Sequence, residues 1–250
     1  MNQIVLFGDS LTEFSHHTDN KGWGAALQNL YVRKLDVLNR GFAGYNTEQG
    51  KLLLSHILPK KNHSIKSPKI YLLTIFFGAN DAAIPPSNHF VPLDKYKENL
   101  KQLIKTVKDS DSPYYSPDTR ILLISPPPLY EEDWEKYQKL IDRKIPRRLE
   151  NTAKYAQTCV DLATELNIPV LNAWKLFMDK VTSSTENNHA LSEFFVDGLH
   201  LSDLGNETLF HGLLDTIRMN WPELDPENLK SITPSWEDLV YNDPKWIMAQ

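Results

Sequence analysis

Short runs of consecutive hydrophobic residues alternate along the chain with stretches of mixed hydrophobic and polar residues. Four runs are rich in β-branched or aromatic residues and are flanked by Gly, Pro or Ser, at 4–7, 70–77, 121–124 and 168–171, and a weaker fifth run covers 34–38. Uninterrupted hydrophobicity is typical of strands that are buried on both faces of a parallel sheet. The runs therefore predict the strands of such a sheet.

Between these runs, hydrophobic residues recur at spacings of three and four, the pattern of a helix with one buried face. The pattern covers 23–31, 96–107, 149–163 and 209–217. Ser202 precedes the last of these stretches and is of a residue type that caps helix N-termini. Strand and helix alternate over most of the chain, which predicts a doubly wound α/β sheet.

The C-terminal part of the chain breaks this alternation. Residues 221–250 hold three of the six tryptophans (Trp221, Trp236 and Trp246) and four of the 16 prolines. Frequent proline argues against long helices. We therefore expect a single α/β domain over residues 1–220 and an irregular tail over 221–250 that packs its aromatic rings on the domain. A lid or a subunit contact is the alternative role for the tail.

Composition narrows the possible partners and compartment. The chain has 250 residues, with 27 Lys and Arg against 32 Asp and Glu, which gives a net charge of −5 with neutral histidines. Such a protein is poorly suited to bind nucleic acid. Its one cysteine, Cys159, cannot form a disulfide within the chain, so no oxidising compartment is required.

The start of the chain lacks the features of a signal peptide, and the longest apolar run is far shorter than the roughly 20 residues of a membrane span. We expect a cytoplasmic protein without a membrane span or a nucleic-acid partner.

Residues with useful chemistry follow several of the predicted strands, and open α/β sheets bind ligands beyond the carboxyl ends of their strands. Ser10 comes just after the first strand, behind a glycine that allows a tight turn, and is well placed for a nucleophile. Asn80 follows the run at 70–77, and its side-chain amide can donate a hydrogen bond to a developing oxyanion. Between them, Gly41 and Gly44 allow backbone N–H groups to turn toward a ligand.

Near the end of the domain, Asp197 stands three positions before His200. An acid at this spacing can orient the imidazole ring and stabilise the imidazolium when it forms. With Ser10, the pair predicts a nucleophile, its base and an orienting acid. A metal site would need further ligands, and the sequence has no His-Glu-x-x-His motif, no cysteine pair and no dense histidine cluster. We expect neither a metal nor an organic cofactor.

Two other motifs do not fit the chain. Five residues instead of four separate Gly44 from Gly50, and Leu52 stands where a P-loop has the Ser or Thr that binds magnesium. The Gly-x-Ser-x-Gly elbow of other lipases is also missing from the sequence.

Taken together, the blocks resemble the SGNH superfamily of GDSL esterases and lipases. The matching segments, in chain order, are Gly-Asp-Ser-Leu at 8–11, Asn-Arg-Gly-Phe-Ala-Gly at 39–44, Gly-Ala-Asn-Asp at 78–81 and Asp-Gly-Leu-His at 197–200. The resemblance implies a catalytic triad of Ser10, Asp197 and His200. It also implies an oxyanion hole made by the backbone N–H groups of Ser10 and Gly44 and by the side chain of Asn80. The fold that it implies is a flavodoxin-like, doubly wound sheet of five parallel strands, and the family also suggests a homodimer.

A narrower resemblance is to the isoamyl acetate-hydrolysing esterases. It rests on segments 40–45, 75–81, 126–135 and 197–202 and on the Trp- and Pro-rich tail. It implies a serine esterase that hydrolyses small carboxylic esters, such as short-chain acyl or acetate esters, through an acyl-enzyme. A carbohydrate deacetylase or a lysophospholipase on the same fold is the alternative. A binding module without catalysis would have no use for Asp197 and His200.

Overall fold

The computed structural model describes residues 1–61, 68–182 and 189–241, and within these residues five parallel strands form one sheet. The strands are β1 (Gln3–Gly8), β2 (Asp36–Gly41), β3 (Ile70–Phe76), β4 (Arg120–Ile124) and β5 (Val170–Leu171). Their order in the sheet is β2-β1-β3-β4-β5, with every neighbouring pair parallel. This is the strand order of flavodoxin-like proteins. The predicted doubly wound, five-stranded α/β fold is confirmed.

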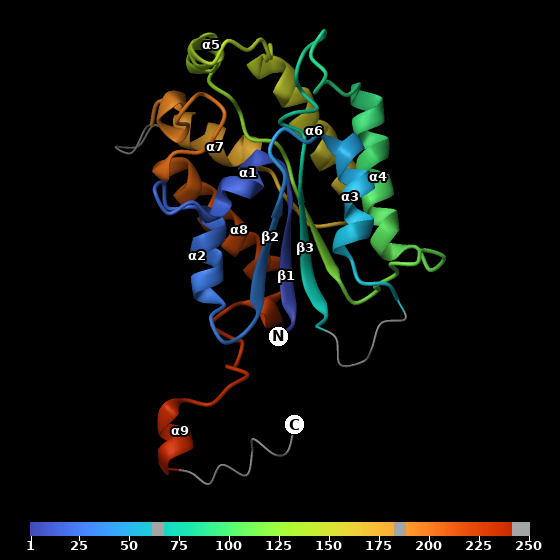
Figure 1. Ribbon diagram of the computed structural model, residues 1–250, viewed down its shortest axis with the longest axis vertical. Coiled ribbons are helices and arrows are strands. Elements are labelled where there is room, and N and C mark those ends of the chain that lie inside the picture. Colours follow the sequence, from blue (N-terminus) through green and yellow to red (C-terminus); the bar gives the residue numbers. More distant parts are fainter. Residues whose placement is uncertain (62–67, 183–188, 242–250) are drawn as a thin grey trace.

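Helices cover both faces of the sheet (Figure 1). One face carries α2 (Trp23–Leu30), α7 (Ala173–Thr182) and α8 (Asp203–Asn220), and the other carries α3 (Thr47–Ile57), α4 (Leu93–Lys108) and α6 (Leu149–Glu165). The short α1 (Ser10–Glu13) and α5 (Glu131–Leu140) lie near the upper end of the sheet in Figure 1. No helix within the described ranges is long and apolar enough to cross a membrane.

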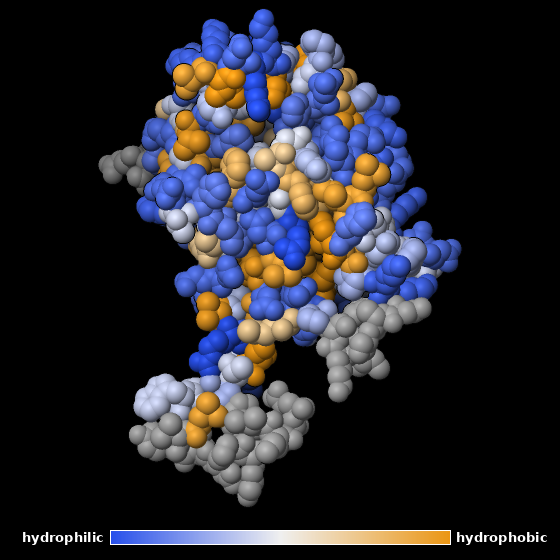
Figure 2. All heavy atoms as spheres, in the orientation of Figure 1, coloured by the Kyte–Doolittle hydropathy of each residue, from blue (hydrophilic) through white to orange (hydrophobic). Residues whose placement is uncertain are grey.

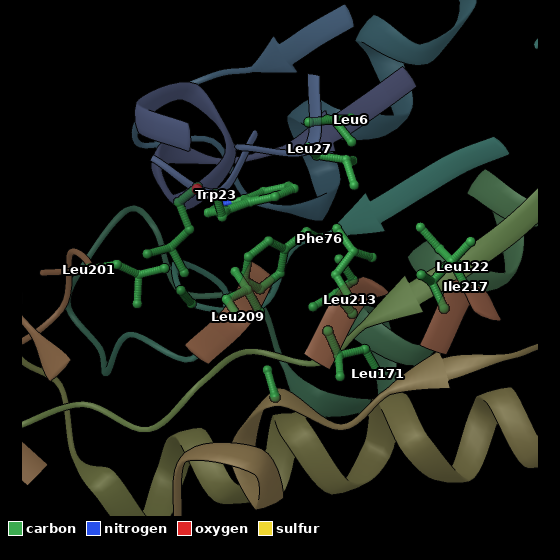
Figure 3. Packing of buried hydrophobic residues seen from close by; sticks show 14 of the residues in the cluster. Leu6, Trp23, Leu27, Phe76, Leu122, Leu171, Leu201, Leu209, Leu213 and Ile217 are labelled. Atoms are coloured by element: carbon green, nitrogen blue, oxygen red, sulfur yellow. Dashed lines mark hydrogen bonds between the residues drawn. The ribbon is translucent and has the colours of Figure 1, made fainter. Parts of the chain in front are cut away.

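Alternate side chains of the interior strands enter two separate hydrophobic cores. In β1, Ile4 and Leu6 point into the core beneath α2 and α8, whereas Val5 and Phe7 point into the core beneath α3, α4 and α6. Figure 3 shows the first core, where Leu6 lies near Leu27 of α2. Because both faces of the sheet are covered, most positions of an interior strand are hydrophobic, with Thr74 of β3 as a buried polar exception. This explains why the strands appear in the sequence as continuous apolar runs.

The second strand is displaced from its prediction. The apolar run suggested 34–38, but β2 spans Asp36–Gly41 and ends in a polar stretch that includes Asn39 and Arg40. The cause is its place at the edge of the sheet, where most of its residues are only partly buried. An edge strand with a solvated side needs no continuous hydrophobic run.

The tail behaves differently in its two halves. Trp221 packs against the first core, and Leu224 just after it is buried. Farther on, Trp236 in α9 (Trp236–Tyr241) is 65% exposed, and Figures 1 and 2 show this helix clear of the main body. The segment before α9 is tied to Arg33, whose Nε donates to Thr233 Oγ1 at 3.0 Å. Trp246 lies outside the described residues. Trp221 is thus partly buried against the core, whereas Trp236 is largely exposed.

The topology leaves a crevice at the carboxyl edge of the sheet. β1 and β3 are neighbours, but the chain continues from β1 to α2 on one face and from β3 to α4 on the other. In open α/β sheets, this divergence of the loops is where ligands bind. The segments that follow β1 and β3 carry Ser10 and Asn80.

We expect Gly41→Ala to destabilise the fold. A Cβ atom at position 41 would lie 1.9 Å from the backbone nitrogen of Glu13 in α1, so β2 and α1 would have to separate. Overpacking of this kind costs about 1–3 kcal/mol, which urea unfolding would measure. Leu52→Ala, at a site that is 72% exposed, is the control and should stay within about 0.5 kcal/mol of the wild type. A wild-type midpoint for Gly41→Ala would show that this contact does not constrain the fold.

Candidate active site

Ser10 lies where β1 leaves the sheet, as the first residue of α1. The turn is tight, because a Cβ atom at Gly8 would come within 2.5 Å of the carbonyl oxygen of Phe76. Asp9 caps α1, and its Oδ1 accepts a hydrogen bond from the backbone N–H of Leu11 at 2.9 Å. Ser10 is therefore held at a helix N-terminus and is only 6% exposed.

Ser10, His200 and Asp197 form a continuous line of hydrogen bonds. The Ser10 Oγ lies 3.0 Å from His200 Nε2, and His200 Nδ1 lies 2.6 Å from Asp197 Oδ2. The other carboxylate oxygen of Asp197 accepts the backbone N–H groups of Leu199 at 3.0 Å and His200 at 2.8 Å. The structure thus brings together the three residues predicted for the triad.

The loop that carries Asp197 and His200 is fixed at both ends. Gly198 has φ +88°, a conformation that favours glycine, and a Cβ atom there would meet the backbone oxygen of Tyr130 at 2.3 Å. The backbone N–H of Tyr130 donates to the Gly198 carbonyl at 2.8 Å. On the far side of the loop, Phe195 and Leu201 form an antiparallel bridge. These contacts hold the loop where His200 Nε2 reaches Ser10 of α1 and Asp197 reaches the His200 ring.

The charge of Asp197 determines which nitrogen of His200 carries the proton and which can accept one. Burial of Asp197 opposes its ionisation, but the hydrogen bonds from the ring and backbone of His200 outweigh burial, so the pKa of Asp197 lies below its ordinary value. An ionised carboxylate can only accept hydrogen bonds, which places the imidazole proton on Nδ1. Nε2 is then free to accept the proton of the Ser10 hydroxyl.

Gly44 lies on the other side of Ser10, in the loop between β2 and α3. Its φ of +81° is a left-handed conformation, while a Cβ atom there would have only an ordinary contact of 3.6 Å with His89 Nε2. The glycine is therefore required by the backbone conformation and not by space. Across the described residues, neither the Ser10 nor the Gly44 backbone N–H donates an intramolecular hydrogen bond.

Asn80 presents its amide from the loop after β3. Its Nδ2 donates to the carbonyl oxygen of Tyr45 at 2.9 Å, which uses one of its two protons. Its Oδ1 accepts a hydrogen bond from Arg147 Nη2 at 2.8 Å. Asn80 is 3% exposed.

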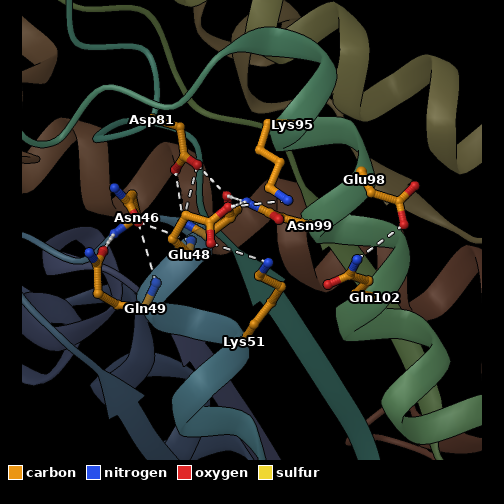
Figure 4. A network of polar contacts seen from close by, with 10 residues as sticks. Asn46, Glu48, Gln49, Lys51, Asp81, Lys95, Glu98, Asn99 and Gln102 are labelled. Atoms are coloured by element: carbon orange, nitrogen blue, oxygen red, sulfur yellow. Dashed lines mark hydrogen bonds and ion pairs between the residues drawn. The ribbon is translucent and has the colours of Figure 1, made fainter.

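A polar network joins the Gly44 loop to the Asn80 loop (Figure 4). Asp81, the residue after Asn80, accepts hydrogen bonds from the backbone N–H of Thr47 at 3.1 and 3.2 Å and from the Thr47 hydroxyl. Asn46 caps α3 by accepting the Glu48 N–H at 2.9 Å. Asn99 of α4 donates to the Thr47 hydroxyl at 2.9 Å. The start of α3 is thus fixed to both loops.

All five predicted site residues line one cavity of about 590 Å³. This size lies within the range of small-molecule sites. A wall of the cavity comes from α5 and the segment after it, through Trp134, Tyr137, Gln138, Ile141 and Ile145. The cavity is therefore lined both by the proposed catalytic residues and by α5 with the segment after it.

A larger cavity of about 890 Å³ lies elsewhere, lined in part by Ile70 and Arg120, which begin β3 and β4. The described residues around it include no histidine or cysteine. Size alone therefore does not locate the chemistry, because the smaller cavity holds the nucleophile and base.

Sequence reasoning missed several residues of the site. Arg147 contacts Asn80 directly, and His200 lies between two aromatic rings, with centroids 5.1 Å from Phe14 and 6.5 Å from Trp134. His89 also lines the cavity. Trp134 stood in one of the segments that resemble the esterase branch, but no local pattern pointed to Arg147.

Two further carboxyl groups are buried beside the site. Desolvation raises the pKa of Asp9 to about 7, against the hydrogen bond from Leu11 and the charge of Arg147. Desolvation also raises the pKa of Asp81 to about 7, against its hydrogen bonds from Thr47. Within the described ranges, no group of three or more His, Cys, Asp or Glu side chains could hold a metal ion.

Comparison with known proteins gives the family. The family model described as GDSL-like lipase/acylhydrolase matches residues 4–213. The chain is 38% identical over 247 residues to the isoamyl acetate-hydrolyzing esterase 1 homolog of Rattus norvegicus, a match that covers 97% of this chain and 90% of the relative. It is 34% identical over 257 residues to the isoamyl acetate-hydrolyzing esterase of Saccharomyces cerevisiae, with 99% and 98% covered.

A solved structure agrees on the fold. The lipase/acylhydrolase from Enterococcus faecalis has a TM-score of 0.64 and 23% identity, and the match covers 94% of this chain and all of that one. The resemblance found in the sequence is therefore confirmed across most of its length, and the chain belongs to the GDSL-like lipase/acylhydrolase family.

Proposed function

We propose that the chain is a serine esterase in which Ser10 attacks small carboxylic esters, His200 acts as the base and Asp197 orients it. Carboxylic ester hydrolysis is the activity of the family to which the chain belongs. The observation that carries the assignment of roles is the line from Ser10 Oγ to His200 Nε2 at 3.0 Å and from His200 Nδ1 to Asp197 at 2.6 Å.

In the first step, His200 Nε2 takes the hydroxyl proton as Ser10 Oγ bonds to the ester carbonyl carbon. The carbonyl oxygen becomes an oxyanion, which the N–H groups of Ser10 and Gly44 and the Nδ2 of Asn80 stabilise. His200 then gives its proton to the departing alcohol, and an acyl-enzyme remains on Ser10. In the second step, water gives a proton to His200 as its oxygen bonds to the acyl carbon. The bond between that carbon and Ser10 Oγ then breaks, His200 returns the proton to Oγ, and the acid and free Ser10 are released.

For the substrate, we propose short-chain acyl or acetate esters such as isoamyl acetate. The support comes from the names of the rat and yeast relatives, both of which match along nearly the full chain. A cavity of about 590 Å³ suits a small molecule of this class. A carbohydrate deacetylase and a lysophospholipase are the alternatives. A cytoplasmic location and a homodimer remain predictions, the first from the single cysteine and the second from the family resemblance.

We expect Ser10→Ala to lose ester turnover by a factor on the order of 10⁴ or more, because the nucleophile is gone. It should also form no covalent adduct with a serine-directed organophosphate, as read by intact-protein mass. Ser55→Ala on α3, whose hydroxyl donates to the Leu52 carbonyl at 3.2 Å, is the matched control and should keep both turnover and labelling. Normal turnover by Ser10→Ala would exclude the proposed nucleophile.

We expect Asn80→Ala to fold but to lose a factor on the order of 10²–10³ in kcat, because one donor to the oxyanion is removed. The donor acts in the transition state, so kcat and kcat/KM should fall together. Steady-state kinetics with p-nitrophenyl acetate would measure both, alongside the melting temperature. A change in KM alone would assign Asn80 to ground-state binding instead.

We expect kcat/KM to be highest for acetate and other short acyl groups. The measurement is a series of p-nitrophenyl esters from acetate to decanoate, run beside isoamyl acetate, acetylated xylan and a lysolipid, with Ser10→Ala as the blank. A preference for acetylated xylan would favour the carbohydrate deacetylase, and a preference for the lysolipid would favour the lysophospholipase.

A further inference from the structure

Arg147 is the one described residue that combines a buried cationic side chain with direct contact to a proposed oxyanion donor. It lies in the segment between α5 and α6, is only 3% exposed and lines the same cavity as Ser10. Burying a guanidinium is costly unless its donors are used. Its neighbour Arg148, in contrast, is exposed and forms ion pairs with Glu131 at 3.3 Å and Glu135 at 2.9 Å.

The planar end of Arg147 clamps the segment that carries Asn80. Its Nη1 donates to the backbone oxygen of Ala79, and its Nη2 donates to Asn80 Oδ1 at 2.8 Å. The guanidinium also stacks near Trp134, with its carbon 5.0 Å from the ring centroid. The Nε is buried and has no hydrogen-bond partner among the described residues. The hydrogen bonds of the guanidinium among the described residues are therefore the two that it donates to residues 79 and 80.

The contact of Arg147 Nη2 with Asn80 Oδ1 and the acceptance of the Nδ2 proton by the Tyr45 carbonyl both favour one orientation of the Asn80 amide. A guanidinium donates hydrogen bonds and cannot accept them, so the amide must turn its oxygen toward Arg147. The Nδ2 then points the other way, donates one proton to Tyr45 and keeps its second proton for the cavity. The opposite rotamer would place Nδ2 against a cation and an acceptor against the developing oxyanion. A cation on the amide oxygen also polarises the amide and makes its N–H a stronger donor.

We propose that Arg147 is a positioning residue of the oxyanion hole, which acts through Asn80 by fixing the amide with Nδ2 directed to the substrate. The inference rests on the proposed function of Asn80 and assigns Arg147 no contact with the reacting atoms.

A purely structural role is the competing explanation. Burial lowers the pKa of Arg147 to about 10, and the nearby carboxylates of Asp9, Asp197 and Asp81 favour its charged form. Arg147 therefore stays protonated at neutral pH and balances buried acids. If this were its whole role, its loss would lower the melting temperature and would reduce activity to the same extent whether or not Asn80 is present.

A double-mutant cycle separates the two roles. In the wild-type background, we expect Arg147→Met to lower kcat by a factor on the order of 10–10², with KM changed by less than about 3-fold. Arg147→Lys keeps the charge and one donor, so it should lose less than Arg147→Met. In the Asn80→Ala background, both substitutions should lower kcat by less than about 3-fold, because the group through which Arg147 acts is gone.

Arg148→Met is the matched control and should keep wild-type kcat, since Arg148 points away from the cavity to Glu131 and Glu135. The inference is overturned if Arg147→Met has wild-type kcat, or if it costs the same factor with and without Asn80. If Arg147→Met does not fold, Arg147→Lys carries the cycle by the same criteria. Failure of both variants to fold would assign Arg147 to structure alone.

The same cycle distinguishes this inference from the proposed function. Wild-type kcat in Asn80→Ala alone would refute the oxyanion role of Asn80. A large loss in Asn80→Ala, with additive losses from Arg147→Met, would refute only the positioning role of Arg147.

Discussion

The chemistry depends on one contact, in which a hydroxyl and an imidazole that are 190 positions apart lie 3.0 Å from each other. The sheet holds the hydroxyl, because Ser10 follows the central strand β1 without an intervening loop. The imidazole comes from a loop that must be placed by α8 just after it. Asn206 of α8 does this, since its Oδ1 accepts the backbone N–H of Trp23 at 3.2 Å and its Nδ2 donates to the Asn20 carbonyl at 3.0 Å. The packing of α8 on α2 therefore adds to the contacts that hold the loop of His200 against Ser10.

Buried groups of opposite charge lie around this contact and compensate one another. Asp9, Asp81 and Arg147 would each be costly to bury alone, and together they offset part of that cost. Desolvation still raises the pKa of Asp9 and Asp81 to about 7, whereas Asp197 keeps a lowered pKa because it accepts the His200 ring and two backbone N–H groups. Asp197, the acid that must stay ionised, is thus the one that accepts hydrogen bonds from the His200 ring and from the backbone of the same loop. Asp9 and Asp81 instead accept hydrogen bonds from backbone N–H groups, Asp9 at the start of α1 and Asp81 at the start of α3.

Much of the fold and of the candidate site could be predicted from the sequence, because it depends on residues that are close together in the chain. The continuous hydrophobicity of 4–7 follows from a strand covered on both faces, and Ser10 and Asn80 follow their strands directly, so the topology alone brings them to one edge. What the sequence did not predict also has physical causes. Because β2 lies at the edge of the sheet, its residues need not be hydrophobic, and its bounds could not be read from an apolar run. Arg147 was missed because it stands beside Arg148 in a segment without hydrophobic periodicity. Only the tertiary fold decides which of two adjacent arginines is buried.

The site has two parts with different origins in the fold. The groups proposed for the chemistry stand on the ends of β1 and β3, on the α3 loop and on the loop before α8, which carries Asp197 and His200. The hydrogen bonds between Asp81 and Thr47 fix the end of β3 to the start of α3. The wall of the cavity comes from α5 and the segment after it, which lie outside the sheet. Substitutions in that wall can reshape the chamber without moving Ser10, so relatives can share the fold and the reaction and still differ in the ester they prefer. Arg147 is where the two parts meet, because it belongs to the wall segment and holds Asn80. A change in the wall that shifts Arg147 would therefore alter turnover as well as specificity.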